Sequence, residues 1–217
     1  MHLSTNRIFL QRAARDFKRT GAVAPSSRAL AQAMTRKLAS RPRSPLAILE
    51  VGAGTGSITQ EIVKHISEGD ILDVYEIDRR FTILLRHRLR AEKKFQDVSS
   101  YVSVFNEPIE NITRIPRYDY VISCLPFTNF APDAVRHIFE LYQAVLKPGG
   151  FCSFYEYIFV RKAVQMISGS PAERGRVSQV TQVVREYIRK YACGQEFILR
   201  NLPPAMVYHV RFGDSRS

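Results

Sequence analysis

The chain has 217 residues, of which 45% are hydrophobic, and this is enough for one domain with a sizeable core. Its three cysteines have no metal-ligand spacing and cannot all pair, which fits a reducing compartment, and its five histidines are scattered. No apolar run approaches the roughly 18 to 20 residues of a membrane-spanning helix, and the N-terminus lacks the apolar core of a signal peptide. The sequence therefore predicts a soluble α/β protein without a metal site.

The net charge of +12 is distributed unevenly along the chain. Residues 1–45 hold ten Lys and Arg against one acidic residue, and residues 161–190 hold seven against two. Residues 46–160 instead hold twelve against fifteen. A slightly acidic centre between basic flanks predicts a large anionic partner, either a nucleic acid or an anionic membrane surface.

Residues 4–19 have a strongly amphipathic helical pattern. At 100° per residue, one narrow face carries two phenylalanines, and the other carries most of the arginines and lysines. This is typical of a helix at a membrane surface, where each basic residue near anionic lipid contributes about 1 kcal/mol. An ordinary helix packed on the domain is the alternative. We expect residues 1–19 to dock on an anionic membrane surface.

A break that contains Gly and Pro follows, and then Ser26 or Ser27 is a good N-cap for a second helix over residues 28–39. A basic, proline-rich connector leads from this helix into the first strand. We expect two units, with residues 1–45 forming helices for membrane docking and a lid, and residues 46–217 forming the main domain.

The stretch from Leu46 to Gly56 combines an apolar strand pattern with a glycine-rich turn. The strand pattern ends in Glu50, and glycines follow at the alternating positions 52, 54 and 56 before a helical pattern. Glycine permits a tight strand-to-helix turn and lets a ligand approach the backbone at the carboxyl edge of a parallel sheet. The spacing differs from the G-x-G-x-x-G of pyrophosphate binders, and no P-loop Lys follows.

Strand and helix patterns alternate along the rest of the chain. Strands are predicted over residues 71–76, 101–105, 118–124 and 151–157, with a closing hairpin over 197–200 and 206–212. Helices are predicted over residues 79–92 and 134–146 and, as basic segments, over 160–192. This alternation predicts an open α/β sheet of seven strands.

Glu76 ends the second predicted strand, twenty residues after Gly56, where a carboxylate can accept hydrogen bonds from a ribose diol. With the E-x-G-x-G-x-G pattern, it makes residues Leu46 to Tyr157 resemble the class I S-adenosylmethionine (SAM) methyltransferases. The resemblance implies SAM as the cofactor. It also implies a Rossmann-like seven-stranded sheet, mostly parallel with a C-terminal antiparallel hairpin.

The resemblance further implies which residues bind SAM. In this class an acid or amide after the third strand often reaches the adenine, although Asn106 and Glu107 could equally begin a turn before Pro108. The predicted cofactor-binding residues are Glu50, Gly52, Ala53, Gly54, Gly56, Glu76, Ile77, Asn106, Glu107, Cys124 and Leu125.

Residues 21–28 and the S-x-L-P-F/L…P loop from Ser123 to Pro132 resemble bacterial phospholipid N-methyltransferases. The resemblance implies methylation of an aminophospholipid such as phosphatidylethanolamine, toward phosphatidylcholine, by a cytoplasmic protein bound to the inner membrane face. An ornithine lipid or a partly methylated intermediate presents a similar amine. The residues predicted to bind the substrate are Arg28, Pro126, Phe127 and Phe130, with Arg161 and Lys162 as further candidate donors to a lipid phosphate.

Ribosomal RNA adenine dimethyltransferases are the alternative, because the core around Glu76 and the Leu-Pro-Phe loop also resemble them. Their loop carries an Asn that holds the adenine amine and an aromatic side chain that stacks on the flipped base. Cys124 stands in that Asn position here, and a thiol is a poor substitute for an amide. The helical RNA-binding domain of that family has no counterpart in the sequence. A lipid substrate is therefore favoured over a nucleic acid.

Methyl transfer from a sulfonium is an in-line displacement that needs a neutral amine and the exclusion of water. An amine near Lys in basicity, with a pKa of about 10.4, must first lose a proton. Tyr155, Glu156 and Tyr157 lie at the C-terminal end of the fifth predicted strand and are the candidate catalytic residues. Aromatic rings also suit a quaternary ammonium. Packing of the two tyrosines against the basic helices is the alternative.

Overall fold

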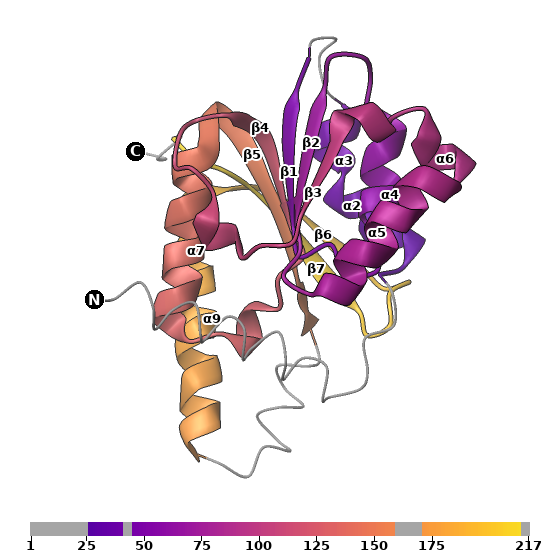
Figure 1. Ribbon diagram of the computed structural model, residues 1–217. Coiled ribbons are helices and arrows are strands. Elements are labelled where there is room, and N and C mark those ends of the chain that lie inside the picture. The colour runs from indigo at the N-terminus through magenta and orange to yellow at the C-terminus, as the bar shows by residue number, and fades with distance from the viewer. Residues whose placement is uncertain (1–25, 41–44, 159–170, 214–217) are drawn as a thin grey trace.

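A computed structural model describes residues 26–40, 45–158 and 171–213 of the chain (Figure 1). The helix predicted over residues 4–19 and the first part of the predicted basic segment, residues 160–170, lie outside the described residues. Membrane docking by residues 1–19 therefore stays a prediction.

A seven-stranded sheet in the order β3-β2-β1-β4-β5-β7-β6 forms the centre of the fold. The first five strands pair in parallel, and β7 is antiparallel to both β5 and β6. This confirms the predicted seven-stranded sheet with its C-terminal antiparallel hairpin. The strands are β1 (Ala47–Val51), β2 (Ile71–Tyr75), β3 (Val102–Phe105), β4 (Tyr118–Ser123), β5 (Leu146–Tyr157), β6 (Ala192–Ile198) and β7 (Ala205–Arg211).

Helices cover both faces of the sheet, and Figure 1 shows α7 and α9 on one side of it and α2, α4 and α5 on the other. Two buried apolar clusters fill the layers between these helices and the sheet. All five residues of β1 are buried, as expected for a central parallel strand covered on both faces. The helices are α2 (Arg28–Met34), α3 (Arg36–Ala39), α4 (Thr59–Ile62), α5 (Arg79–Ala91), α6 (Lys93–Gln96), α7 (Pro132–Val145) and α9 (Pro171–Tyr191).

Local capping explains where two of these helices begin. The Ser27 hydroxyl accepts a hydrogen bond from the backbone N–H of Leu30 at 3.2 Å, which makes Ser27 the N-cap of α2. Asp78 caps α5 in the same way, accepting from the N–H of Arg80 at 2.9 Å. Because Asp78 lies three residues after the end of β2, this cap fixes the chain just beyond the second strand.

Three boundaries differ from the sequence-based prediction. The helix predicted over 28–39 is divided into α2 and α3 at Thr35, whose hydroxyl donates back to the Ala31 carbonyl at 3.0 Å. Strand β5 begins at Leu146, before the Pro-Gly-Gly segment that was expected only to end a helix. Strand β6 begins at Ala192 because pairing with β7 stabilises a polar stretch of weak strand propensity.

Helix α2 packs into the same apolar cluster as the strands, through buried side chains such as Leu30 and Met34. The described part of the predicted N-terminal unit is therefore in direct contact with the sheet. The division of the chain into residues 1–45 and 46–217 stays a prediction.

The carboxyl ends of the parallel strands lie at one edge of the sheet, at the lower side of Figure 1. Because β7 runs antiparallel to β5 and pairs Ala205 with Tyr157, the turn that joins β6 to β7 lies at this same edge. The loops after β1, β2, β3 and β4, the end of β5 and the hairpin turn are thus brought together.

Candidate functional site

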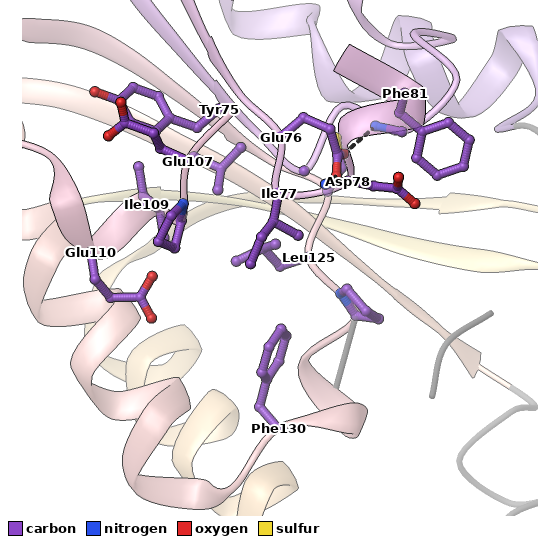
Figure 2. Close-up of a pocket in the computed structure, with 16 residues that line it drawn as sticks. Tyr75, Glu76, Ile77, Asp78, Phe81, Glu107, Ile109, Glu110, Leu125 and Phe130 are labelled. Atoms are coloured by element: carbon purple, nitrogen blue, oxygen red, sulfur yellow. Dashed lines mark hydrogen bonds between the residues drawn. The ribbon is translucent and has the colours of Figure 1, made fainter. Parts of the chain in front are cut away.

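A cavity that is open to solvent lies at the carboxyl edge of the sheet (Figure 2). Its walls come from the ends of β1 and β2 and from the loops after β3 and β4. The lining residues are Val51, Gly52, Gly54, Tyr75, Glu76, Ile77, Asp78, Phe81, Glu107, Pro108, Ile109, Glu110, Cys124, Leu125, Pro126 and Phe130. Seven of the residues predicted to bind the cofactor and two predicted to bind the substrate are among them.

The glycine-rich turn is fastened to the end of β2 through Glu76. One oxygen of the Glu76 carboxylate accepts from the N–H of Gly54 at 2.8 Å, and the other accepts from the N–H of Asp78 at 2.7 Å. Gly54 has φ 55°, and a Cβ built there would meet no heavy atom within 4 Å. The backbone of the turn therefore faces open space, which suits close approach by a ligand.

Gly56 and Ala53 were also predicted to bind the cofactor, but both lie outside the cavity lining. At Gly56 φ is 81°, and a Cβ would come within 2.5 Å of Leu85 Cδ2 on α5. Its role is therefore close packing of the turn against that helix. Ala53 is buried in the cluster of apolar residues on the same side of the sheet.

Glu50 lies beneath the turn, with 0% of its surface exposed. Neither carboxyl oxygen accepts a hydrogen bond of ordinary geometry from any residue that the structure describes. Burial is the main cause that raises the pKa of Glu50 to about 8; the nearby Thr59 lowers it in part, and the charge of Glu76 raises it further. Glu50 is consequently protonated at neutral pH until a cation approaches it.

The loop after β3 contributes differently from the prediction. The Asn106 amide donates to the backbone carbonyls of Glu76 and Ile77 at 3.0 and 3.1 Å, so it holds the loop after β2 and is not part of the lining. Glu107 does line the cavity, and so does Glu110, which was not predicted. Figure 2 shows Glu110 and Phe130 toward the same, lower part of the cavity. The only sequence signal for Glu110 was a second acid in this loop.

The loop after β4 places Pro126 and Phe130 in the lining, but Phe127 turns away from it. The Phe127 ring packs in the core 5.1 Å from the ring of Phe139, measured between centroids. Arg176, on α9, donates to the carbonyls of Thr128 and Phe130 at 2.6 and 2.9 Å. This arginine holds the loop from the side of α9, and no local sequence pattern indicated the contact.

Cys124 lines the cavity at the end of β4, where its N–H donates to the Val51 carbonyl at 2.8 Å. Burial, and then the charges of Glu50 and Glu76, raise the pKa of its thiol well above the ordinary value. Cys124 is therefore a neutral thiol at physiological pH rather than a thiolate nucleophile or metal ligand.

The three candidate catalytic residues lie on β5 outside the cavity lining, and they do not share one face of the sheet. Tyr155 and Tyr157 face α2, and their rings meet edge to face with centroids 5.2 Å apart. Glu156 points to the opposite face, because side chains alternate along a strand. Burial raises the pKa of Tyr155 well above its ordinary value, so its hydroxyl stays protonated and can orient a substrate but not act as a ready base.

Arg28, the remaining predicted substrate residue, is the exposed first residue of α2 and lies outside the lining. It directly follows Ser27, whose N–H donates to the Asn201 side chain in the hairpin turn at 2.9 Å. Arg28 is therefore held near the edge of the sheet but at its surface.

The cavity is acidic. Its lining contains four carboxylates, Glu76, Asp78, Glu107 and Glu110, and among the described residues it contains no Lys or Arg. Such a lining favours a cationic ligand. Within residues 26–40, 45–158 and 171–213 no group of His, Cys, Asp and Glu could hold a metal ion.

Known proteins resemble this chain in sequence and fold. A family model described as a methyltransferase domain matches residues 49–152. An ornithine lipid N-methyltransferase from Singulisphaera acidiphila is 26% identical over 166 residues, which cover 76% of this chain and 74% of the relative.

Two solved structures share the fold. An O-methyltransferase from Bacillus cereus in complex with SAH has a TM-score of 0.61 at 17% identity, covering 96% of this chain and 90% of the other. The O-methyltransferase TomG from Streptomyces achromogenes, in complex with SAM, has a TM-score of 0.59 at 15% identity, covering 94% and 90%.

Proposed function

We propose that this chain, a SAM-dependent methyltransferase, transfers methyl groups to the amine of a membrane lipid. The observation that carries the proposal is the acidic lining of the cavity, which has four carboxylates and, among the described residues, no basic side chain. The cofactor and a protonated amine are both cationic, so both are attracted to such a lining. The lipid N-methyltransferase from S. acidiphila supports the same class of acceptor.

The residues of the cavity suit SAM, which supplies an electrophilic methyl group when it is bound. We propose that the backbone at Gly52 and Gly54 accommodates its amino-acid end, since Gly54 faces open space. Glu76 is proposed to accept from the ribose, and Ile77 and Leu125 to provide apolar contacts. Glu50 is proposed to act from beneath the turn, where its buried carboxyl ionises when the positive charge of the cofactor comes close.

The acceptor amine is proposed to enter beside Pro126 and Phe130. The Glu110 carboxylate, in the same part of the cavity, stabilises the incoming ammonium, and the Phe130 ring suits a methylated one. These groups orient the amine and exclude water, which is what the displacement requires.

Two head groups fit this proposal. Phosphatidylethanolamine carries a phosphate beside its amine, and the surface position of Arg28 suits that phosphate. Ornithine lipid carries an amine without a phosphate, and the S. acidiphila relative favours it. In either case we propose that the enzyme works at the inner membrane face.

An RNA acceptor is disfavoured by the residue that follows β4. Cys124, a neutral buried thiol, offers only weak hydrogen bonds in place of an amide.

The head group is tested by offering purified protein and SAM to two sets of vesicles, one with phosphatidylethanolamine and one with ornithine lipid, each in phosphatidylcholine. Mass spectrometry of the extracted lipids should show additions of one or more methyl groups in at least one set. Glu110→Gln should slow this reaction about tenfold, while Glu68→Gln, at an exposed site near the opposite edge, should not. Unmodified lipid in both sets, with SAM bound, would contradict the proposed function.

A further inference from the structure

The turn of the β6–β7 hairpin holds the most exposed apolar side chains of the described residues. Leu199 is 70% exposed and Leu202 is 82% exposed, and Phe197 beside them is 48% exposed. A leucine that is exposed alone is common on protein surfaces, but two at one turn beside a phenylalanine form a small apolar projection. We name residues 197–204 the hairpin tip.

We propose that the hairpin tip inserts into the surface of a lipid bilayer and turns the cavity toward it. The inference rests on the proposed lipid substrate, and it adds a second membrane contact in a part of the chain remote in sequence from residues 1–19.

The position of the hairpin tip carries the first part of the argument. Strand β7 is antiparallel to β5 and pairs Ala205 with Tyr157, and the N–H of Ile158 donates to the Pro204 carbonyl at 3.0 Å. The tip therefore lies beside the end of β5, at the edge of the sheet that holds the cavity. Figure 1 shows the turn between β6 and β7 at this lower edge. A lipid held there has its head group next to the loops that line the cavity.

The hairpin tip is also held in shape. Asn201, between the two leucines, is only 4% exposed. Its side-chain oxygen accepts from the N–H of Ser27 at 2.9 Å, and its amide donates to the Pro203 carbonyl at 2.8 Å. Asn201 thus points into the protein and joins the turn to the start of α2, while its leucine neighbours point outward. The exposure of Leu199 and Leu202 is therefore part of a fixed arrangement.

The charges around the hairpin tip favour a lipid bilayer as its binding partner. Arg200, between the two leucines, and Arg28, next to Ser27, are both exposed, and residues 197–204 contain no acid. Apolar side chains flanked by arginine suit the boundary between acyl chains and anionic head groups. A second protein chain is a poorer match, because three side chains fall far short of the roughly 800 Å² per partner of a stable interface.

Vesicle cosedimentation tests the proposal with the full chain. We expect Leu199→Ser with Leu202→Ser to weaken binding to vesicles of phosphatidylcholine with phosphatidylglycerol roughly 10- to 100-fold. The matched control is Ile83→Ser with Ile115→Ser, which removes two exposed isoleucines elsewhere and should leave binding unchanged. SAM affinity, measured by calorimetry, should be the same in all three proteins. Equal vesicle binding by the double leucine variant and the wild type would overturn the proposal, as would no binding by the wild type.

A fluorescent reporter gives a second, independent readout, because the chain contains no tryptophan. Leu202→Trp should show a blue-shifted emission with these vesicles and quenching by brominated acyl chains, while Ile115→Trp should show neither. Absence of both changes at position 202 would overturn the insertion. The proposed function is judged separately: if the tip inserts but no lipid is methylated, the substrate assignment fails and the membrane surface stands.

Discussion

The most informative single substitution is Glu50→Gln, because Glu50 is buried beneath the glycine turn and its pKa is raised from 4.5 to about 8. In the unfolded chain at pH 7 this carboxyl is ionised, while in the folded protein without cofactor it is protonated. Because folding raises this pKa, the stability of the fold depends on pH through Glu50. The protein is most stable with respect to this group below pH 4.5, and it loses that stability as the pH rises toward 8.

The magnitude follows from the size of the shift. Between the ordinary pKa and pH 7, each pH unit costs about 1.4 kcal/mol, so keeping Glu50 protonated costs about 3 kcal/mol at pH 7 and less than about 1 kcal/mol at pH 5. Glutamine has nearly the same shape and is neutral in both states, so it removes this cost. Glu50→Gln should therefore raise the free energy of unfolding by about 3 kcal/mol at pH 7 and by little at pH 5.

Urea unfolding of both proteins at pH 5, 6 and 7, without SAM, measures this difference. The gap between the two proteins should widen steadily as the pH rises. A constant gap, or a variant less stable than the wild type at pH 7, would refute the assignment of a neutral, buried Glu50.

Three further predictions concern the site and the flank. Glu76→Ala should weaken SAM binding, measured by calorimetry, roughly 100-fold, because it removes the proposed ribose acceptor and the hydrogen bond to the glycine turn. The control Glu68→Ala should leave SAM affinity unchanged, and equal affinities of Glu76→Ala and the wild type would disprove the ribose role. Arg176→Met should release the loop that carries Phe130 and raise the KM for the acceptor about tenfold, with SAM affinity unchanged. An unaltered KM would show that the loop needs no support from α9. Deletion of residues 1–19 should weaken cosedimentation with anionic vesicles while SAM binding persists, and equal cosedimentation would exclude docking by this segment.

The parallel part of the fold could be predicted from sequence because it depends on local patterns. The apolar run before Gly52 is buried on both faces as β1, and the acid twenty residues after Gly56 directly follows β2 at the same edge. Alternation, glycine turns and helix caps are all visible within a few residues. The side of the cavity that we propose binds SAM could be predicted from these patterns together with the strand order.

The part of the cavity that we propose binds the acceptor amine depends on contacts between distant segments, which no local sequence pattern contains. Phe127 was expected to meet the substrate, yet it completes the core against α7, and Phe130 takes the position in the lining. Asn106 was expected to reach adenine, yet it braces the loop after β2. Glu110 became visible as a lining residue only when the loop after β3 was placed beside the loop after β4.

The β6–β7 hairpin, near the C-terminal end of the chain, also depends on contacts that local sequence patterns do not predict. Strand β6 reads as a polar segment around Gly194 and is a strand only because β7 pairs with it. Asn201 looks like an ordinary turn residue, and its bond to Ser27 joins positions that are far apart in the sequence. The hydrogen bond from Ser27, which is remote in the sequence, and not the one to the nearby Pro203 carbonyl, therefore determines the role of Asn201.

The central claim, that a lipid amine accepts the methyl group, is tested most directly by following a radiolabelled methyl group from SAM. Purified protein is incubated with labelled SAM in the presence of both aminolipid vesicles and ribosomal RNA, and the two are then separated by solvent extraction. We predict that the label enters the organic phase, in a lipid whose head group carries the added methyl groups. Label recovered in the RNA, with none in the lipid, would contradict the account.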